Sequence, residues 1–319
     1  MRRVDTGVCP HCGTTVSIGG AGRGSVRRPD DDAIIDRGRG PAARMVRIDA
    51  DTYVPFDHLS YEQMALRSEI RDAVSALAAG PEEVLEARLH GDKPAQADVE
   101  NLLIYNIGAA HLKVASRHGL RFELAPPPAE SISRFGYRYS LDDRAAGFHH
   151  WIPARRLVSW DTIEVQAITS DNVLERVWLA LQRGVVTLEE WRFDRQAPFS
   201  VRLVLRPPAG SIAAPAALIK GLVDGVICAF QADQGIEPVV DVAQRLARTM
   251  PADEEEITRG LLGIRQPPLG MVPRLVHARG SGVAWAPADE HCVAGELLLQ
   301  PPDADTWTLS GEIHEITPR

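Results

Sequence analysis

Residues 201–230, VRLVLRPPAGSIAAPAALIKGLVDGVICAF, contain the pattern that decides the fold. A short strand ends at Pro207 and Pro208, and a long apolar helix follows the loop. Residues 85–107, LEARLHGDKPAQADVENLLIYNI, have the same order of strand, Pro-containing loop and helix. This shared order predicts two similar half-domains packed on one another, with a boundary near residues 165–170.

The second of these helices, expected over residues 216–232, is the most apolar segment of the chain. Its large apolar side chains lie on one broad face, which predicts burial against a sheet. Gly221 and Gly225 lie on another face, where the lack of a Cβ lets a neighbouring element come close. We therefore expect this helix to be buried on two sides.

The other elements indicate an α+β protein: a mainly antiparallel sheet with helices on one face, divided into an N-terminal half, 45–168, and a C-terminal half, 169–319. Met45 begins the first expected strand of the body. Ser60 and Gln63 have the spacing of a capping box for the first helix, and Asp171 is expected to cap a later one. Strands are expected at 84–90, 120–124, 132–139, 149–160, 200–205, 272–278, 283–286, 296–300 and 307–313, and helices at 61–77, 99–107, 216–232, 239–249 and 253–262.

Residues 1–44 are rich in Gly, Arg and Asp and lack periodic apolar residues. We expect a disordered tail or a non-native extension, with the native protein beginning at Met45. The segment contains Cys9-Pro-His-Cys12, which is half of a zinc knuckle. Structural zinc takes four ligands, and the sequence has no second Cys-x-x-Cys pair, so it does not favour zinc.

Charge and apolar content do not favour nucleic-acid-binding or membrane-spanning proteins. The net charge is −8, and because residues 1–44 carry eight Arg and five Asp, the remaining body is near −11. An acidic body does not favour nucleic-acid binding, which needs cationic surface. No apolar run is long enough for a membrane span, and no secretory signal is visible, so we expect a soluble cytoplasmic protein with no membrane contact. Arg outnumbers Lys 32 to 3, which is typical of GC-rich bacterial genomes.

Asp98 and Glu100 stand where the expected helix 99–107 begins. Two acids at this spacing can share one Mg²⁺ or Mn²⁺ ion. The other interpretation is structural, with Asp98 as an N-cap and Glu100 and Asn101 as solvated residues of the first turn. The sequence leaves both interpretations open.

The stretch Asp98-Val-Glu100-Asn-Leu-Leu resembles the helix start of RusA-like Holliday-junction resolvases. The resemblance implies that Asp98 and Glu100 bind a divalent metal for phosphodiester hydrolysis. It covers about ten residues and departs from the family at two places. The family has a Lys where Ile104 stands, and an Asp about twenty residues further on, where this chain has Arg117-His-Gly119.

Three further groups are candidates for chemistry or for the core. Lys220 and Asp224, one helical turn apart, suggest either a buried functional pair or an ion pair at a helix edge. His149 and His150 are expected on a strand, where neighbours face opposite sides and do not share a metal. The remaining two cysteines are expected to be buried free thiols: Cys228 and Cys292.

Two function classes follow from the sequence. It lacks a phosphate-binding P-loop, a dinucleotide-binding glycine motif, a nucleophile elbow and a His-Glu-x-x-His zinc motif. We therefore expect a binding or assembly subunit of a bacterial complex, without catalytic activity and with a protein partner. The alternative is a divalent-metal-dependent, nuclease-like enzyme that uses Asp98 and Glu100.

Overall fold

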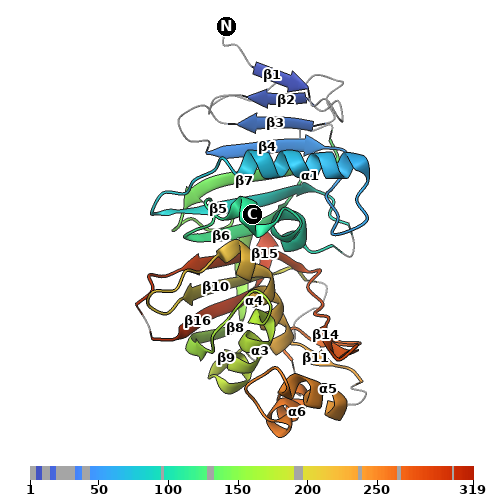
Figure 1. Cartoon of the computed structure of the whole chain (residues 1–319), viewed down its shortest axis with the longest axis vertical. Helices are drawn as coiled ribbons and strands as arrows, with labels where there is room; N and C mark the ends of the chain where they lie inside the picture. Colours follow the sequence, from blue (N-terminus) through green and yellow to red (C-terminus); the bar gives the residue numbers. More distant parts are fainter. Residues whose placement is uncertain are drawn as a thin grey trace.

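One large mixed β-sheet runs through the chain in the computed structural model (Figure 1). The structure describes residues 44–94, 97–127, 133–189, 197–235, 239–263, 267–303 and 305–319, and the backbone of three strands nearer the N-terminus. Twelve strands pair in the order β1-β2-β3-β4-β7-β5-β6-β15-β10-β16-β8-β9. Their bounds are β1 Asp5–Val8, β2 Thr15–Ile18, β3 Ala33–Arg37, β4 Met45–Ala50, β5 Glu83–Gly91, β6 Gly119–Ala125, β7 Phe135–Asp143, β8 Trp151–Val165, β9 Val186–Leu188, β10 Phe199–Arg206, β15 Cys292–Leu299 and β16 Trp307–Pro318.

The main helices lie on one face of this sheet, in front of it in Figure 1. The remaining elements form a smaller lobe beside α3 and α4. Helical segments are α1 Tyr61–Val74, the π-helical turn η1 Asn101–Tyr105, α2 Ala109–Leu112, α3 Val173–Arg183, α4 Pro215–Ala229, α5 Val239–Ala247 and α6 Glu254–Gly263. Four short strands pair outside the main sheet: β11 Ala232–Asp233, β12 Met271–Val272, β13 Val276–Arg279 and β14 Gly282–Trp285.

The two sides of the sheet repeat one strand order. Its centre is the antiparallel pair β6–β15, and a parallel partner lies outside each of these strands, β5 beside β6 and β10 beside β15. The next strand outward is antiparallel on each side, β7 beside β5 and β16 beside β10. A further antiparallel strand follows it, β4 beside β7 and β8 beside β16. These four strands on each side, numbered in chain order among themselves, run from outside to centre as first, fourth, second, third on both sides. The predicted α+β class, with a mainly antiparallel sheet and helices on one face, is confirmed.

The core lies between the sheet and its helices. Helix α4 packs against α3, and a Cβ at Gly221 would lie 1.9 Å from Cγ1 of Val173, whereas one at Gly225 would lie 2.8 Å from the carbonyl oxygen of Leu174. The close approach that the glycines predict is therefore confirmed. The opposite side of α4 contributes Ile219, Val226 and other residues to the main core.

Local signals at the helix ends had mixed outcomes. The Ser60–Gln63 capping box is present, with both reciprocal hydrogen bonds. Asp171 is not the cap of α3, so that prediction is wrong: the N-cap is Asn172, whose side-chain oxygen accepts a hydrogen bond from the backbone N–H of Thr169.

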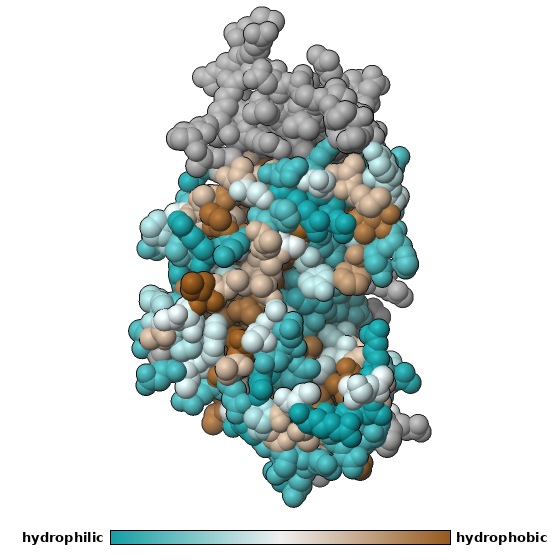
Figure 2. All heavy atoms as spheres, in the orientation of Figure 1, coloured by the Kyte–Doolittle hydropathy of each residue, from teal (hydrophilic) through white to brown (hydrophobic). Residues whose placement is uncertain are grey.

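Several other expectations can be compared with the structure. Cys228 and Cys292 are buried free thiols, as expected. Among the described residues, no helix is both long and apolar enough to span a membrane. Figure 2 shows a mostly hydrophilic surface over the helices, with apolar residues in small groups. Residues 1–44 contain the backbone of β1, β2 and β3, and the expectation of a disordered tail or a non-native extension stays a prediction. The zinc knuckle expected at Cys9 and Cys12 lies outside the described residues.

Candidate functional site

Four carboxylates from three separate segments surround the ammonium group of Lys220. Its Nζ lies 3.1 Å from an oxygen of Asp224 and 3.7 Å from Oε2 of Glu100. Asp289 and Asp98 complete the group, with oxygens 3.8 Å and 4.0 Å from Nζ. We call these five residues the Lys220 cluster. The structure thus joins the two groups that the sequence treated separately, the Asp98–Glu100 pair and the Lys220–Asp224 pair.

Three elements position these side chains. Asp98 and Glu100 lie between the end of β5 and η1, where the chain begins its helical turn. Lys220 and Asp224 are one turn apart on α4, which contacts η1. Asp289 lies in the loop just before β15, and its carbonyl oxygen accepts a hydrogen bond from the N–H of Cys292. Since β15 is central in the sheet, this turn holds Asp289 against the helices.

The structural interpretation of the Asp98–Glu100 pair is wrong for Glu100. Its side chain is not solvated, because the residue is only 4% exposed. Asp98 accepts a hydrogen bond from the side-chain amide of Asn101, Nδ2 to Oδ2, at 2.6 Å. The Lys220–Asp224 ion pair is confirmed, but it lies inside a group of four acids, whereas the sequence considered it as an isolated pair.

Burial and mutual repulsion make three of the carboxylates, those of Glu100, Asp224 and Asp289, weaker acids. Burial raises the pKa of Glu100 to about 8, and the nearby charges of Asp224 and Asp98 act in the same direction. Burial likewise raises the pKa of Asp289 to about 8, again assisted by Asp224 and Asp98. Burial also raises the pKa of Asp224, and the charge of Asp98 acts in the same direction. The cluster therefore retains protons near neutral pH in the absence of further cations.

The lysine balances only part of this charge. Burial on its own would lower the pKa of Lys220, but the four carboxylates together raise it above the ordinary value, so the ammonium stays charged. Lys93 lies near Asp98 and Asp289, and burial lowers its pKa. When all four acids are ionised, the two amines balance only half of their charge, so a further cation would stabilise the ionised cluster.

One oxygen of the cluster has no hydrogen-bond partner. Oε1 of Glu100 is fully buried and unpaired, whereas Oε2 faces Lys220. A buried carboxylate oxygen without a partner costs free energy, so its presence indicates a missing donor, water or ion. Carboxylate oxygens are the ligands that Mg²⁺ and Mn²⁺ prefer, so a divalent cation is one candidate for the missing partner of this oxygen.

The repeated strand order makes the two helix starts comparable. In the register of the central strands, Arg121 lies opposite Glu296. The parallel neighbour of Arg121 is Glu86, and the parallel neighbour of Glu296 is Arg202. Glu86 and Arg202 are therefore equivalent, and they are 116 positions apart. The same separation relates Val99 to Pro215, and both residues begin their helical segments.

This equivalence relates the two halves of the Lys220 cluster. At the same separation, Asp98 and Glu100 correspond to Ala214 and Ala216, and Ile104 corresponds to Lys220. One side of the sheet thus supplies Asp98 and Glu100, and the other supplies Lys220, Asp224 and Asp289. Sequence reasoning noted that Ile104 stands where a lysine would be expected, but only the tertiary structure brings Lys220 next to the acids.

Asp289 was missed by the sequence analysis. It is 189 positions after Glu100, and no motif or periodicity relates the two. Its one local signal is its place in a loop just before an apolar strand. Only the pairing of β15 with β6 and β10 brings it to Lys220.

The sheet face opposite the helices carries a row of alternating charges across five neighbouring strands. Oε1 of Glu296 lies 2.5 Å from Nε of Arg121, and its Oε2 accepts a hydrogen bond from Nε of Arg202 at 3.0 Å. Arg121 is 1% exposed, so this is a buried ionic network. The strand registers give the complete row: Glu86, Arg121, Glu296, Arg202 and Glu312.

Comparison with known proteins adds little to this geometry. No protein-family model matches the chain, and no curated protein matches it. Among solved structures, a chain described as "Cyanuric acid hydrolase: evolutionary innovation by structural concatenation" is similar over 86% of this chain and 67% of that one, at 10% identity and a TM-score of 0.17. A similarity at that level carries no argument about fold or function, so the function is argued from the site.

Proposed function

We propose that the chain is a divalent-metal-dependent, nuclease-like hydrolase whose active site is the Lys220 cluster. The observation that carries the proposal is the buried, unpaired Oε1 of Glu100 within a group of four carboxylates. The resemblance of the Asp98–Glu100 stretch to RusA-like resolvases supports a phosphodiester as the substrate.

The residues divide the chemistry between them. Asp98, Glu100 and Asp289 would hold Mg²⁺ or Mn²⁺, which would supply Lewis-acid stabilisation of a phosphodiester oxygen. Lys220, kept charged by its neighbours, would stabilise negative charge on the phosphate. Glu100 and Asp289, whose pKa values are about 8 without a cation, would release their protons on binding the ion.

Cation-dependent cleavage of DNA tests this proposal. Labelled duplex, single-stranded and branched DNA would be incubated with the protein and Mg²⁺ or Mn²⁺. We expect cleavage to fall at least about 100-fold in Asp98→Asn/Glu100→Gln, as for the loss of a main catalytic interaction. The matched control is Glu254→Gln/Glu255→Gln, which removes two exposed acids from α6.

The outcomes are clear in either direction. Cleavage by the wild type and the α6 control, but not by the cluster variant, supports the proposal. Equal cleavage by all three proteins contradicts it. The absence of cleavage also contradicts it if neither cation stabilises the wild type.

A binding or assembly role is the second candidate, and an exposed aromatic pair favours it. Phe56 and Tyr105 stack with ring centroids 5.4 Å apart and are 62% and 49% exposed. Exposed aromatic residues are enriched at protein interfaces. If this pair binds a protein partner, Phe56→Ser/Tyr105→Ser will lose that partner in a cross-linking experiment while the melting temperature stays within a few degrees of the wild type.

A further inference from the structure

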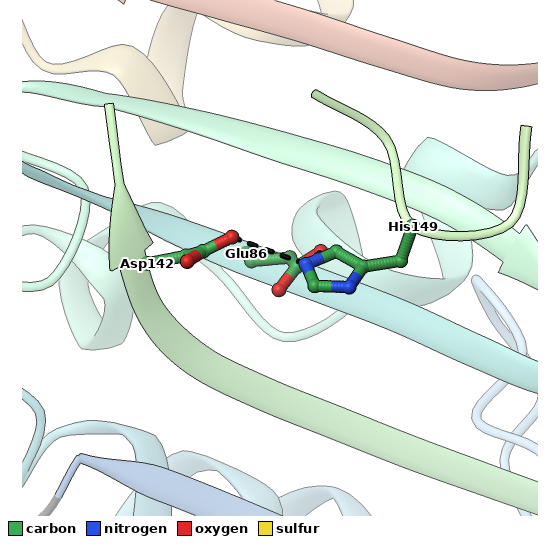
Figure 3. A group of neighbouring side chains, drawn as sticks. All are labelled: Glu86, Asp142 and His149. Carbon is green, nitrogen blue, oxygen red and sulfur yellow. Dashed lines mark hydrogen bonds and ion pairs between the residues drawn. The ribbon is translucent and has the colours of Figure 1, made fainter. Parts of the chain in front are cut away.

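A second group of metal-ligating side chains lies on the polar face of the sheet, away from the helices. Nε2 of His149 is 3.0 Å from Oε1 of Glu86 and 3.1 Å from Oδ2 of Asp142. The three ligand atoms all lie within 4.8 Å of one another. Figure 3 shows the imidazole pointing between the two carboxylates. We propose that Glu86, Asp142 and His149 form a binding site for Zn²⁺ or a similar transition-metal ion, independent of the Lys220 cluster.

The hydrogen bonding of the buried Glu86 side chain is incomplete. Glu86 is 2% exposed, and its Oε1 makes no hydrogen bond although Nε2 of His149 lies 3.0 Å away, while Oε2 accepts a hydrogen bond from Oγ of Ser140 at 3.2 Å. His149 approaches both carboxylates through the same nitrogen. One N–H proton can make a linear hydrogen bond to only one of them, whereas a cation between the three atoms satisfies all of them.

The distances between the ligand atoms also suit a zinc ion. In a tetrahedral zinc site with bonds of about 2.0–2.1 Å, neighbouring ligand atoms are about 3.3 Å apart. The observed separations of 3.0 Å and 3.1 Å from His149 to the two carboxylates are close to that value. One imidazole with two carboxylates suits zinc and its neighbours in the transition series better than Mg²⁺, which prefers oxygen alone.

Surrounding residues hold these ligands in place. Asp142 accepts a hydrogen bond from the N–H of Asp143 at 2.8 Å and lies 3.6 Å from Arg121. The backbone N–H of His149 donates to Oε1 of Glu123 at 3.2 Å, which anchors the segment between β7 and β8 to β6. Hydrogen bonds of this kind fix the orientation of metal ligands.

The site is open on one side. The His149 side chain is 42% exposed and that of Asp142 is 27% exposed, so an ion can enter from solvent. Three protein ligands leave a fourth position for water or a further ligand, as in zinc sites with an exchangeable position. The sequence analysis considered His149 only with His150, and the structure places the ring of His150 against His90 instead, with centroids 5.5 Å apart.

Cobalt binding tests this inference separately from the proposed function. Co²⁺ would be titrated into the metal-free full chain while its visible absorption is recorded, and Zn²⁺ would then be added to displace it. We expect His149→Ala and Glu86→Gln each to weaken binding at least about 100-fold, because each removes a ligand. His150→Ala is the matched control, since it removes the neighbouring imidazole, and Asp98→Asn/Glu100→Gln alters the other site. Both controls should keep the wild-type spectrum.

Three results would overturn the inference. The first is a wild type that binds neither Co²⁺ nor Zn²⁺ below millimolar concentrations. The second is an unchanged affinity in His149→Ala, with circular dichroism in EDTA showing that every variant is folded. The third is a cobalt spectrum lost in Asp98→Asn/Glu100→Gln but kept in His149→Ala, which would assign the ion to the Lys220 cluster.

Discussion

Replacing Glu100 with Gln should change how the stability of the protein depends on pH. Burial raises the pKa of Glu100 in the folded state to about 8, from an ordinary value of 4.5. The folded protein therefore holds this proton more tightly than the unfolded chain does. Between about pH 4.5 and pH 8, Glu100 is ionised in the unfolded chain but still protonated in the folded protein. The free energy of unfolding therefore falls as the pH rises through this range.

The size of the effect follows from that shift. One pKa unit corresponds to about 1.4 kcal/mol, so between pH 5 and pH 8.5 the wild type should lose about 4 kcal/mol through this group. Gln at position 100 has nearly the same shape and does not titrate. Relative to the wild type, Glu100→Gln should therefore become more stable by about 4 kcal/mol over this interval.

Urea unfolding in EDTA at the two pH values measures this difference. Asp289 titrates in the same range, but it is present in both proteins, so its contribution largely cancels. Glu255→Gln is the control, because Glu255 is an exposed residue of α6 and its replacement should show no such change. If the stability difference between Glu100→Gln and the wild type is the same at pH 5 and pH 8.5, the argument that Glu100 is protonated in the folded protein is wrong.

Three other perturbations have defined outcomes. Lys220→Met leaves four carboxylates without their central ammonium, so urea unfolding should show a loss of about 3–5 kcal/mol at pH 8 and a smaller loss at pH 5. Gly221→Ala forces a Cβ against Val173 and should cost about 1–3 kcal/mol in thermal unfolding, whereas Gly235→Ala, with open space around it, should stay within about 0.5 kcal/mol. Ser60→Ala removes the capping box and should cost about 1 kcal/mol in urea; an unchanged midpoint would contradict a stabilising role for that cap.

Part of the fold could be predicted because local physics decides it. Apolar periodicity indicated most helices and strands of the body, and the prediction of close packing at Gly221 and Gly225 rests only on the absent Cβ. Boundaries were less accurate: the first helix ends at Val74, three residues earlier than expected. The Asp171 cap was wrong because the helix begins one residue later than expected, with Asn172 at the N-cap, and the side-chain oxygen of Asn172 accepts from Thr169 and not from the helix.

The candidate site was only half visible in the sequence. Asp98 and Glu100 stood out because two acids at a helix start form a recognisable local pattern. Their partners Lys220 and Asp289 are more than 100 positions away, so no spacing rule could relate them. The same holds for Glu86 and His149, whose contact depends on how the segment after β7 folds back over the sheet.

The sequence by itself determined which segments become helices and strands, because those choices depend on residues a few positions apart. It also placed two carboxylates at the start of one helix. Only the tertiary structure decided that both acids face a lysine from the other side of the sheet, that Glu100 is buried and that burial raises its pKa. The physical reason is that desolvation and charge–charge interactions depend on distance in space, and the central pairing of β6 with β15 sets those distances.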